Sequence, residues 1–287
     1  MNTTALAMVL VAAVVHASWN LAAKRVSGGP RFVWLYYTVS AVAMLPVIAV
    51  ALAVEPERPQ WTWLVAALVT AVLHVVYGIV LQRGYEVGDL SIVYPLARGT
   101  GPLVSVLVAV TVLGERPGVL GLIGAFLVVG GVLVISLGGG STGDAQARRA
   151  GVFYGVATGV VIAAYTLWDA HSVTSLSVPP LVYFGGGAIA QSILLAPTAA
   201  RGRSDIKRLW RDHRREVLIV GLASPAGYLL VLYALRIAPV SLVAPARELS
   251  IVFGGVAAWL VLRERNAVRR LAGSLVVLAG IAAIAVA

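Results

Sequence analysis

The sequence predicts an all-α integral membrane protein with ten transmembrane helices, arranged as two inverted five-helix repeats. Three observations lead to this fold class. The chain is 60% hydrophobic and only 12% charged, whereas an average soluble domain has about 25% charged residues. Its apolar residues come in runs of about 20, the length that crosses a bilayer as a helix. Two segments of the chain also have nearly the same sequence, which indicates an internal duplication.

Ten apolar runs follow one another along the chain with short connections between them. The connections are charged or contain Gly and Pro, as in SGGPR, EPERP and GERP, which is typical of turns. The first run has no basic residues ahead of it, so we expect a retained span rather than a cleaved signal. The predicted spans are 4–23, 32–54, 62–82, 91–113, 118–137, 150–171, 179–199, 217–236, 240–262 and 267–286.

The duplicated segments are 94–116, with the sequence YPLARGTGPLVSVLVAVTVLGER, and 244–265, with the sequence APARELSIVFGGVAAWLVLRER. Their positions correspond as Pro95 to Pro245, Arg98 to Arg247, Glu115 to Glu264, Arg116 to Arg265, Gly124 to Gly273 and Gly131 to Gly280. We therefore expect a first repeat over 1–137, a cytoplasmic linker over 138–149 and a second repeat over 150–287. Because each repeat has an odd number of spans, the second enters the membrane from the opposite side.

Basic residues set the expected orientation. Of the 22 Lys and Arg residues, 17 fall in the loops after odd-numbered spans, and only Arg58, Arg116 and Arg236 lie on the other side. This bias predicts a bacterial inner-membrane protein with the 200–216 loop in the cytoplasm and both termini outside. We interpret that loop as a topology determinant; contact with anionic lipid headgroups is the alternative. The net charge of +10 is spread over short tracts between spans, which argues against a nucleic-acid partner.

Ionisable side chains inside spans are candidate functional groups, because a bilayer makes them costly. Arg98 and Arg247 occupy equivalent positions in spans 4 and 9, and inversion places them at mirrored depths. They could form two gates or the two ends of a cavity, and a guanidinium suits a carboxylate ligand. The alternative is that both snorkel or cap helices structurally. Glu248 and Asp169 are candidates for coupling or for an interhelical ion pair, with Asp169 a partner for Arg247.

Polar and aromatic residues also share helix faces at spacings of three and four residues. They predict an aromatic-walled cavity for an amphipathic organic substrate; the alternative is that several are interfacial or packing residues. The predicted substrate-binding residues are His16, Trp19, Asn20, His74, Tyr77, Tyr94, Arg98, Tyr165, Trp168, Tyr228 and Arg247.

Four prolines inside predicted spans, Pro95, Pro102, Pro225 and Pro245, are candidate hinges, with simple packing kinks as the alternative. His16 and His74 have no further ligand nearby in sequence, so we expect no metal site. The chain has no cysteine and no motif for a cofactor, and we expect none to bind.

The chain resembles the ten-span, EamA-like members of the drug/metabolite transporter superfamily. The residues that carry the resemblance are HASWNLAAK in span 1, SIVYPLARGTGPLVSVLVAVTVLGER in spans 4–5 and SLVAPARELSIVFGGVAAWLVLRER in spans 9–10. The resemblance implies inverted five-helix repeats, a central cavity and alternating access without ATP, and many members export amino acids or related metabolites. Small four-span multidrug members carry a coupling glutamate in their first helix. Here span 1 has His16 and Asn20 but no acid, which argues against proton-coupled export of lipophilic cations.

The sequence thus predicts a secondary transporter that exports amino acids or similar small amphipathic metabolites. The alternative in the same class is a multidrug or organic-cation exporter. An intramembrane enzyme or binding protein is the alternative from another class, and no nucleophile, metal cluster or paired acid near the midplane favours it. We expect no enzyme activity, a small-molecule substrate and the lipid bilayer as partners, and a monomer or weak dimer.

Overall fold

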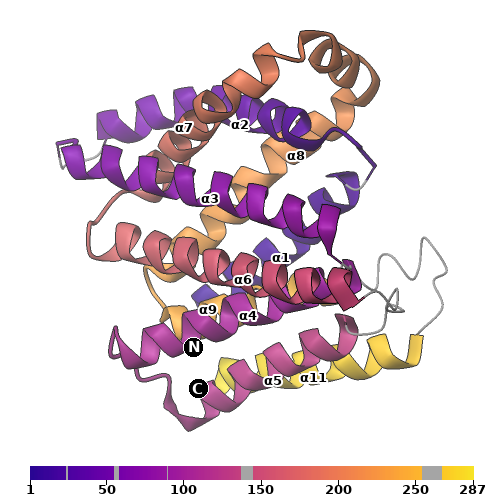
Figure 1. The fold of residues 1–287 in the computed structure, drawn as a ribbon. Coiled ribbons are helices and arrows are strands. Elements are labelled where there is room, and N and C mark those ends of the chain that lie inside the picture. The colour runs from indigo at the N-terminus through magenta and orange to yellow at the C-terminus, as the bar shows by residue number, and fades with distance from the viewer. Residues whose placement is uncertain (24, 55–57, 89, 137–144, 254–266) are drawn as a thin grey trace.

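The computed structural model describes all of the chain except residues 24, 55–57, 89, 137–144 and 254–266 (Figure 1). Within the described ranges every regular element is a helix. The helices are α1 Thr3–Ala23, α2 Gly29–Val54, α3 Trp61–Val87, α4 Leu90–Thr111, α5 Gly118–Ser136, α6 Ala145–Thr174, α7 Pro180–Ala200, α8 Arg203–Leu235, α9 Val240–Ala246 and α11 Ala267–Val286. A further helical stretch covers residues 249–253 and leads into the undescribed segment.

Eight of the described helices, α1 to α8, are long and apolar enough to cross a membrane. Each overlaps the predicted span of the same number, and the tenth predicted span, 267–286, coincides with α11. The ninth predicted span continues beyond residue 253 and lies partly outside the described residues. The all-helical membrane fold is therefore confirmed, and the count of ten spans stays a prediction.

Three helices extend past the predicted spans. Helix α3 continues to Val87, and α6 begins at Ala145, so residues 145–149 of the predicted linker are helical. Helix α8 begins at Arg203, well before the predicted start of the span. Runs of apolar residues mark only the part of a helix that lies in lipid, and charged residues can continue the same helix into water. The linker over 138–149 stays a prediction, and its last five residues are helical.

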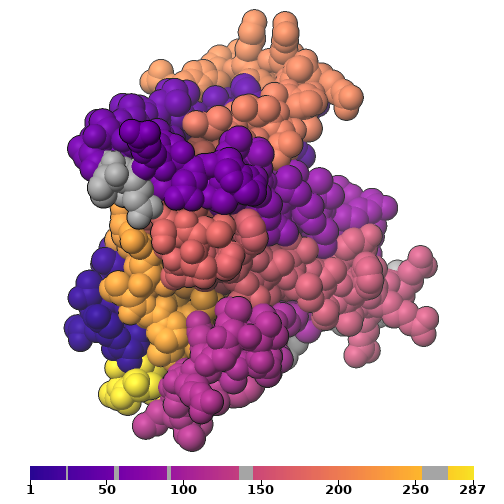
Figure 2. Space-filling model, turned by 90° about the vertical axis from the view of Figure 1, so that its left-hand side faces the viewer, coloured from indigo at the N-terminus to yellow at the C-terminus, as the bar shows by residue number. Residues whose placement is uncertain are grey.

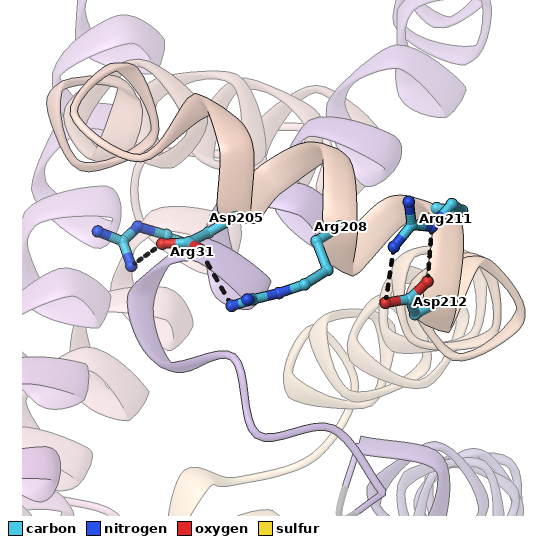
Figure 3. A network of polar contacts seen from close by, with 5 residues as sticks. All are labelled: Arg31, Asp205, Arg208, Arg211 and Asp212. Carbon is cyan, nitrogen blue, oxygen red and sulfur yellow. Dashed lines mark hydrogen bonds and ion pairs between the residues drawn. The ribbon is translucent and has the colours of Figure 1, made fainter.

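The N-terminal part of α8 is a short surface helix rather than a loop. At His213 the backbone leaves the helical region, with φ −129° and ψ 26°, and this kink separates 203–212 from the membrane-crossing part. Leu209 is buried against Phe32 and Leu35 of α2. Figure 3 shows the polar contacts on the same segment: Asp205 pairs with Arg31 at 2.7 Å and with Arg208 at 3.0 Å, and Arg211 pairs with Asp212 at 2.9 Å. The Arg31–Asp205 pair and the packing of Leu209 hold the segment onto α2, whereas the other two pairs lie within the segment.

Part of the helix packing repeats under exchange of the two repeats. Three contacts join equivalent helices, α2 with α7, α4 with α9 and α5 with α11. Several further contacts have a counterpart under this exchange: α1–α8 with α3–α6, α2–α8 with α3–α7, and the extensive α4–α6 contact with the much smaller α1–α9 contact. Such reciprocal contacts are typical of a two-fold arrangement. In both views the surface segment of α8 lies at one end of the molecule, and α5 with α11 lies at the other (Figures 1 and 2).

Helices α5 and α11 approach until their backbones touch. A Cβ atom placed on Gly124 would lie 2.7 Å from the carbonyl oxygen of Gly280, and one on Gly131 would lie 2.7 Å from that of Gly273. Higher residue numbers in α5 therefore meet lower numbers in α11, so the helices run antiparallel. Each glycine meets the counterpart of the other in the duplicated sequence. Small residues allow this close packing, which larger side chains would prevent.

The Glu of the duplicated Leu-x-Glu-Arg motif caps a helix of the other repeat. The Glu115 carboxylate accepts hydrogen bonds from the backbone N–H groups of Val240 and Ser241, both at 2.9 Å. These donors belong to the first turn of α9, where N–H groups have no partner within the helix and the helix dipole favours a negative charge. Its counterpart Glu264 lies outside the described residues. The motif therefore joins the first repeat to the start of α9.

Candidate functional site

The predicted ninth span is broken at the pair of residues singled out in the sequence. Helix α9 ends at Ala246, Arg247 and Glu248 form a turn, and residues 249–253 are helical again. Across the turn the backbone N–H groups of Glu248 and Ile251 bond to acceptors three residues back, Pro245 at 2.9 Å and Glu248 at 2.9 Å. This tighter winding differs from the four-residue spacing of an α-helix. The turn lies inside the predicted span 240–262, directly after the candidate hinge Pro245.

Of the four candidate hinge prolines, Pro245 lies beside this break. Pro95 and Pro102 lie inside α4 and Pro225 inside α8, and both helices continue through them. Proline removes one backbone donor and so costs a helix one hydrogen bond. A helix can continue in spite of this loss, as α4 and α8 do. Whether any of the four acts as a hinge stays a prediction.

Arg98 of α4 pairs with Glu248 across the two repeats. Its Nη2 atom lies 3.0 Å from Oε2 of Glu248 and 3.4 Å from the Ser250 hydroxyl, to which it donates. The Glu248 side chain is only 7% exposed. Among the described residues, Arg98 Nε and Glu248 Oε2 have no partner with hydrogen-bond geometry. The pair is thus held by the attraction of opposite charges. Its unbonded atoms, Arg98 Nε and Glu248 Oε2, can form hydrogen bonds with water or a ligand. Of the two alternatives predicted for Glu248, the interhelical ion pair is present.

Arg247 has a different environment from its counterpart. It is half-buried, and its guanidinium carbon lies 5.8 Å from the centre of the Tyr228 ring. No carboxylate within the described part of the chain lies at ion-pair distance from it. The predicted pairing with Asp169 is not formed, because hydroxyl groups surround that carboxylate instead. Arg247 is therefore a half-buried cation without a counter-ion among the described residues.

Asp169 is the centre of a second polar cluster and is only 1% exposed. Its Oδ1 atom accepts hydrogen bonds from Thr70 of α3 at 2.9 Å and from the Tyr183 hydroxyl of α7 at 2.6 Å. Its Oδ2 atom accepts from the Tyr228 hydroxyl of α8. Three donors on three helices satisfy the two Asp169 oxygens, and no cation is among these partners. The sequence prediction missed Tyr183; the available signal was a phenol inside an apolar span, which needs a polar partner once buried.

Aromatic rings from four helices form a continuous row beside this cluster. His74 stacks on Tyr165 with ring centres 4.3 Å apart, and Tyr165 meets Tyr77 at 5.8 Å. On its other side His74 contacts the Tyr228 ring at 5.7 Å, and Tyr228 contacts Phe184 at 5.7 Å. Phe184 was also missed by the sequence analysis. The row brings four predicted residues together, His74, Tyr77, Tyr165 and Tyr228, and Arg247 lies over the ring of Tyr228.

The other predicted site residues have looser connections to this row. His16 contacts Trp19 edge-on at 4.6 Å and lies within electrostatic range of both Arg98 and Arg247. Trp19 packs against the Phe32 cluster between α2 and α8, and Asn20 follows it on α1. Trp168 donates to the backbone carbonyl of Ala66 at 3.0 Å and packs against the main core. Tyr94 is 41% exposed. The cavity role of these five stays a prediction.

Two cavities lie away from the polar cluster. One, of about 860 Å³, is lined by the start of α6, including Arg148, Arg149 and Phe153. The other, of about 390 Å³, lies between α2 and Leu181. At the cluster itself the hydroxyl, imidazole and carboxylate groups bond to one another. In this conformation the aromatic row is therefore packed, and a substrate would have to displace these contacts.

Comparisons with known proteins agree with this architecture. A protein of solved crystal structure is similar over 100% of this chain and 98% of its own, with a TM-score of 0.77 and 17% sequence identity, which establishes the fold alone. None of the curated proteins matches the chain. The EamA-like transporter family model matches twice, over residues 3–137 and 149–286. These two matches cover nearly the whole chain, so this multi-pass membrane protein belongs to the EamA-like transporter family of the drug/metabolite transporter superfamily.

Proposed function

We propose that the protein is a secondary transporter that exports amino acids or similar small amphipathic metabolites by alternating access. The observation that carries the proposal is Arg247, a half-buried cation at a helix break, placed against Tyr228 without a counter-ion among the described residues. An unpaired charge inside a membrane protein is costly and marks a functional site by default. A substrate carboxylate would supply the missing charge.

The contrast with Arg98 strengthens this assignment. Arg98 already has the Glu248 carboxylate at 3.0 Å and so brings no net charge to the site. Arg247 keeps its five N–H donors, and a guanidinium binds both oxygens of a carboxylate at once. Of the two equivalent arginines, Arg247 is therefore the substrate-binding one, and Arg98 links the repeats.

The aromatic row suits the rest of such a substrate. Tyr77, Tyr165, Tyr228 and Phe184 offer ring faces to an apolar side chain, and the tyrosine hydroxyls can hydrogen-bond to polar groups. A site with one cation over a row of rings favours a molecule that is anionic at one end and apolar at the other.

The packing supports alternating access between inverted repeats. Part of the helix packing repeats under exchange of the two halves, and α5 and α11 run antiparallel. Inverted repeats of this kind alternate by rocking around a site at their interface, and broken helices commonly line it. The turn at Arg247–Glu248 and the Arg98–Glu248 pair both lie at that interface. On this proposal the protein has ten spans in a bacterial inner membrane, with both termini outside.

Counterflow in proteoliposomes tests the proposal. Purified protein is reconstituted with a panel of unlabelled amino acids inside, and uptake of each labelled counterpart is measured. We expect Arg247→Gln to lose most of the exchange that the wild type shows, while Arg236→Gln, at an exposed position after α8, exchanges normally. Wild-type exchange by Arg247→Gln would make this arginine structural and remove the basis of the proposal.

One observation favours a second candidate function, export of organic cations. Asp169 is a buried carboxylate that accepts hydrogen bonds from two tyrosine hydroxyls, and a carboxylate beside aromatic rings can bind an organic cation. Lipophilic cations should then inhibit exchange in competition with substrate, and Asp169→Asn should remove this inhibition. If such cations neither inhibit exchange nor accumulate, this candidate is excluded.

A further inference from the structure

Two neighbouring arginines at the start of α6 lie far from the site described above. Arg148 and Arg149 are both exposed, and no ion pair or hydrogen bond joins either side chain to another residue in the described ranges. The cavity of about 860 Å³ opens beside them. Asp169 lies further along the same helix, about 30 Å away at the rise of an α-helix. The transport proposal therefore does not account for these two charges.

Beyond the arginines, one face of α6 is apolar and uncovered. Val152, Phe153, Val156 and Val160 are all exposed, and Phe153 is 67% exposed. The first three line the same cavity as the two arginines. Spacings of three and four residues place these side chains on one stripe of the helix. An apolar stripe inside a membrane-crossing helix faces lipid, so the arginines stand at the head of a lipid-facing surface.

Close backbone contacts on another face hold the start of α6 in this orientation. Gly151 and Gly155 are both buried. A Cβ atom placed on Gly155 would lie 2.8 Å from Cβ of Leu96 on α4, and one on Gly88, at the end of α3, would lie 2.7 Å from Cα of Gly151. The helix therefore cannot turn to bury its apolar stripe without separating from α3 and α4.

The length of this surface matches one leaflet of a bilayer. From Arg149 to Val160 the helix rises about 16 Å, and the hydrocarbon core of a bilayer is about 30 Å thick, or about 15 Å for each leaflet. The stripe thus has cations at one end and apolar side chains over the depth of a leaflet. A guanidinium binds the oxygens of a phosphate group through several hydrogen bonds at once.

We propose that the start of α6 is a binding site for one anionic phospholipid. Its headgroup phosphate binds Arg148 and Arg149, and an acyl chain lies along the apolar stripe. Two positive charges favour a headgroup with net negative charge over a zwitterionic one, whose cationic end they repel. A soluble anion would leave the stripe unused, and a cytoplasmic protein would not reach side chains inside the bilayer. In the predicted orientation the lipid belongs to the cytoplasmic leaflet.

The corresponding helix of the first repeat lacks this feature. Under exchange of the repeats α6 corresponds to α1, and α1, Thr3–Ala23, contains no lysine or arginine. The duplication therefore does not explain the two arginines. We expect one such lipid for each molecule, bound to the second repeat.

Native mass spectrometry of the purified protein tests the headgroup contact. Phosphatidylglycerol and phosphatidylcholine are titrated separately, and we expect one tightly bound phosphatidylglycerol. Arg148→Gln/Arg149→Gln should weaken its binding about 30-fold, because two charges near a membrane surface are removed. The matched control is Arg214→Gln/Arg215→Gln, an adjacent pair of exposed arginines on α8, which should bind like the wild type. Equal binding of the two lipids, or equal losses in the two double variants, overturns the proposal.

A second pair of variants tests the acyl-chain contact. Phe153→Ala should weaken phosphatidylglycerol binding several-fold, whereas Phe126→Ala, at an exposed phenylalanine of α5, should not. Inorganic phosphate should not displace the lipid. Displacement by phosphate would make this a site for soluble anions, and a dimer that Phe153→Ala converts to monomer would mean that a second copy covers the stripe; either result contradicts the proposal. Melting temperatures without added lipid control for folding. These measurements involve no transport, so they hold whether or not the proposed function does.

Discussion

At the scale of single residues, two equivalent arginines have different partners. Arg98 and Arg247 occupy matching positions in the duplicated sequence, but Gly99 follows the first and Glu248 follows the second. Of the two positions that follow these arginines, only the one in the second repeat therefore holds an acid. It pairs with the arginine of the first repeat, because adjacent residues on one chain point in different directions. The asymmetry of the site thus arises from one residue.

Removing one member of this ion pair should cost more than removing both. Arg98→Gln leaves a buried Glu248 carboxylate unpaired and should destabilise the protein by about 3–5 kcal/mol. The double variant Arg98→Gln/Glu248→Gln should lose markedly less, because no charge is left uncompensated. Chemical denaturation in detergent measures both, with Arg83→Gln at an exposed pair as the control. Equal losses in the single and double variants would contradict this account of the pair.

Glu115 should contribute to stability as a cap rather than to transport. Glu115→Ala removes the acceptor for two N–H groups at the start of α9 and should destabilise the protein by about 1–2 kcal/mol. Glu115→Gln keeps an acceptor without the charge and should fall between. The measurement is the unfolding free energy in detergent. Unchanged stability in Glu115→Ala would mean that water replaces the carboxylate at no cost.

At the scale of elements, helix contacts depend on where glycine is placed. Gly130 and Gly131 are neighbours in α5, but a Cβ on Gly130 meets nothing within 4 Å, whereas one on Gly131 lies 2.7 Å from the Gly273 carbonyl oxygen. The first faces away from α11 and the second lies in the contact. Substitutions at these two adjacent positions therefore distinguish the effect of helix propensity from the effect of helix packing.

The two alanine variants should change stability in opposite directions. Gly130→Ala should stabilise α5 by up to about 1 kcal/mol through helix propensity. Gly131→Ala gains the same propensity but forces α5 and α11 apart, with a net loss on the order of 1–3 kcal/mol. Melting temperatures of the two variants in detergent, compared with the wild type, provide the test. A stabilising Gly131→Ala would show that the two helices separate easily.

At the scale of the whole molecule, the helix packing and the distribution of basic residues both bear on how the chain is oriented in the membrane. The surface segment 203–212 and the α5–α11 pair lie at opposite ends of the molecule (Figure 2). The basic residues of that segment are mostly exposed, which suits a position at the cytoplasmic face. Because the sequence has no cysteine, single cysteines can be introduced without background.

Single-cysteine labelling should place Asn2 and Ser204 on opposite sides of the membrane. Ser204→Cys, exposed at the start of α8, should react with a membrane-impermeant maleimide only after cells are opened. Asn2→Cys, exposed at the N-terminus, should react in intact cells. Circular dichroism and expression level serve as controls for folding. Labelling of both positions from the same side would exclude the predicted orientation.

Much of the fold was accessible from the sequence, because its signals are local. A run of apolar residues long enough to cross a bilayer must form a helix there, since lipid offers the backbone no partners. The predicted range 267–286 therefore coincides with α11, and the predicted spans 1 to 8 overlap α1 to α8. The same logic missed the helical residues 145–149 and the surface helix of α8, because water tolerates both helix and loop.

The sequence by itself determined the membrane-helical class, the duplication and the family, through composition, span length and the repeated motif. Only the tertiary structure decided the partners of the buried charges: Arg98 with Glu248, Asp169 with Thr70, Tyr183 and Tyr228, and Arg247 over the Tyr228 ring. The reason is physical. Insertion into lipid is decided segment by segment, whereas a contact between residues about 100 or 150 positions apart depends on how every helix packs.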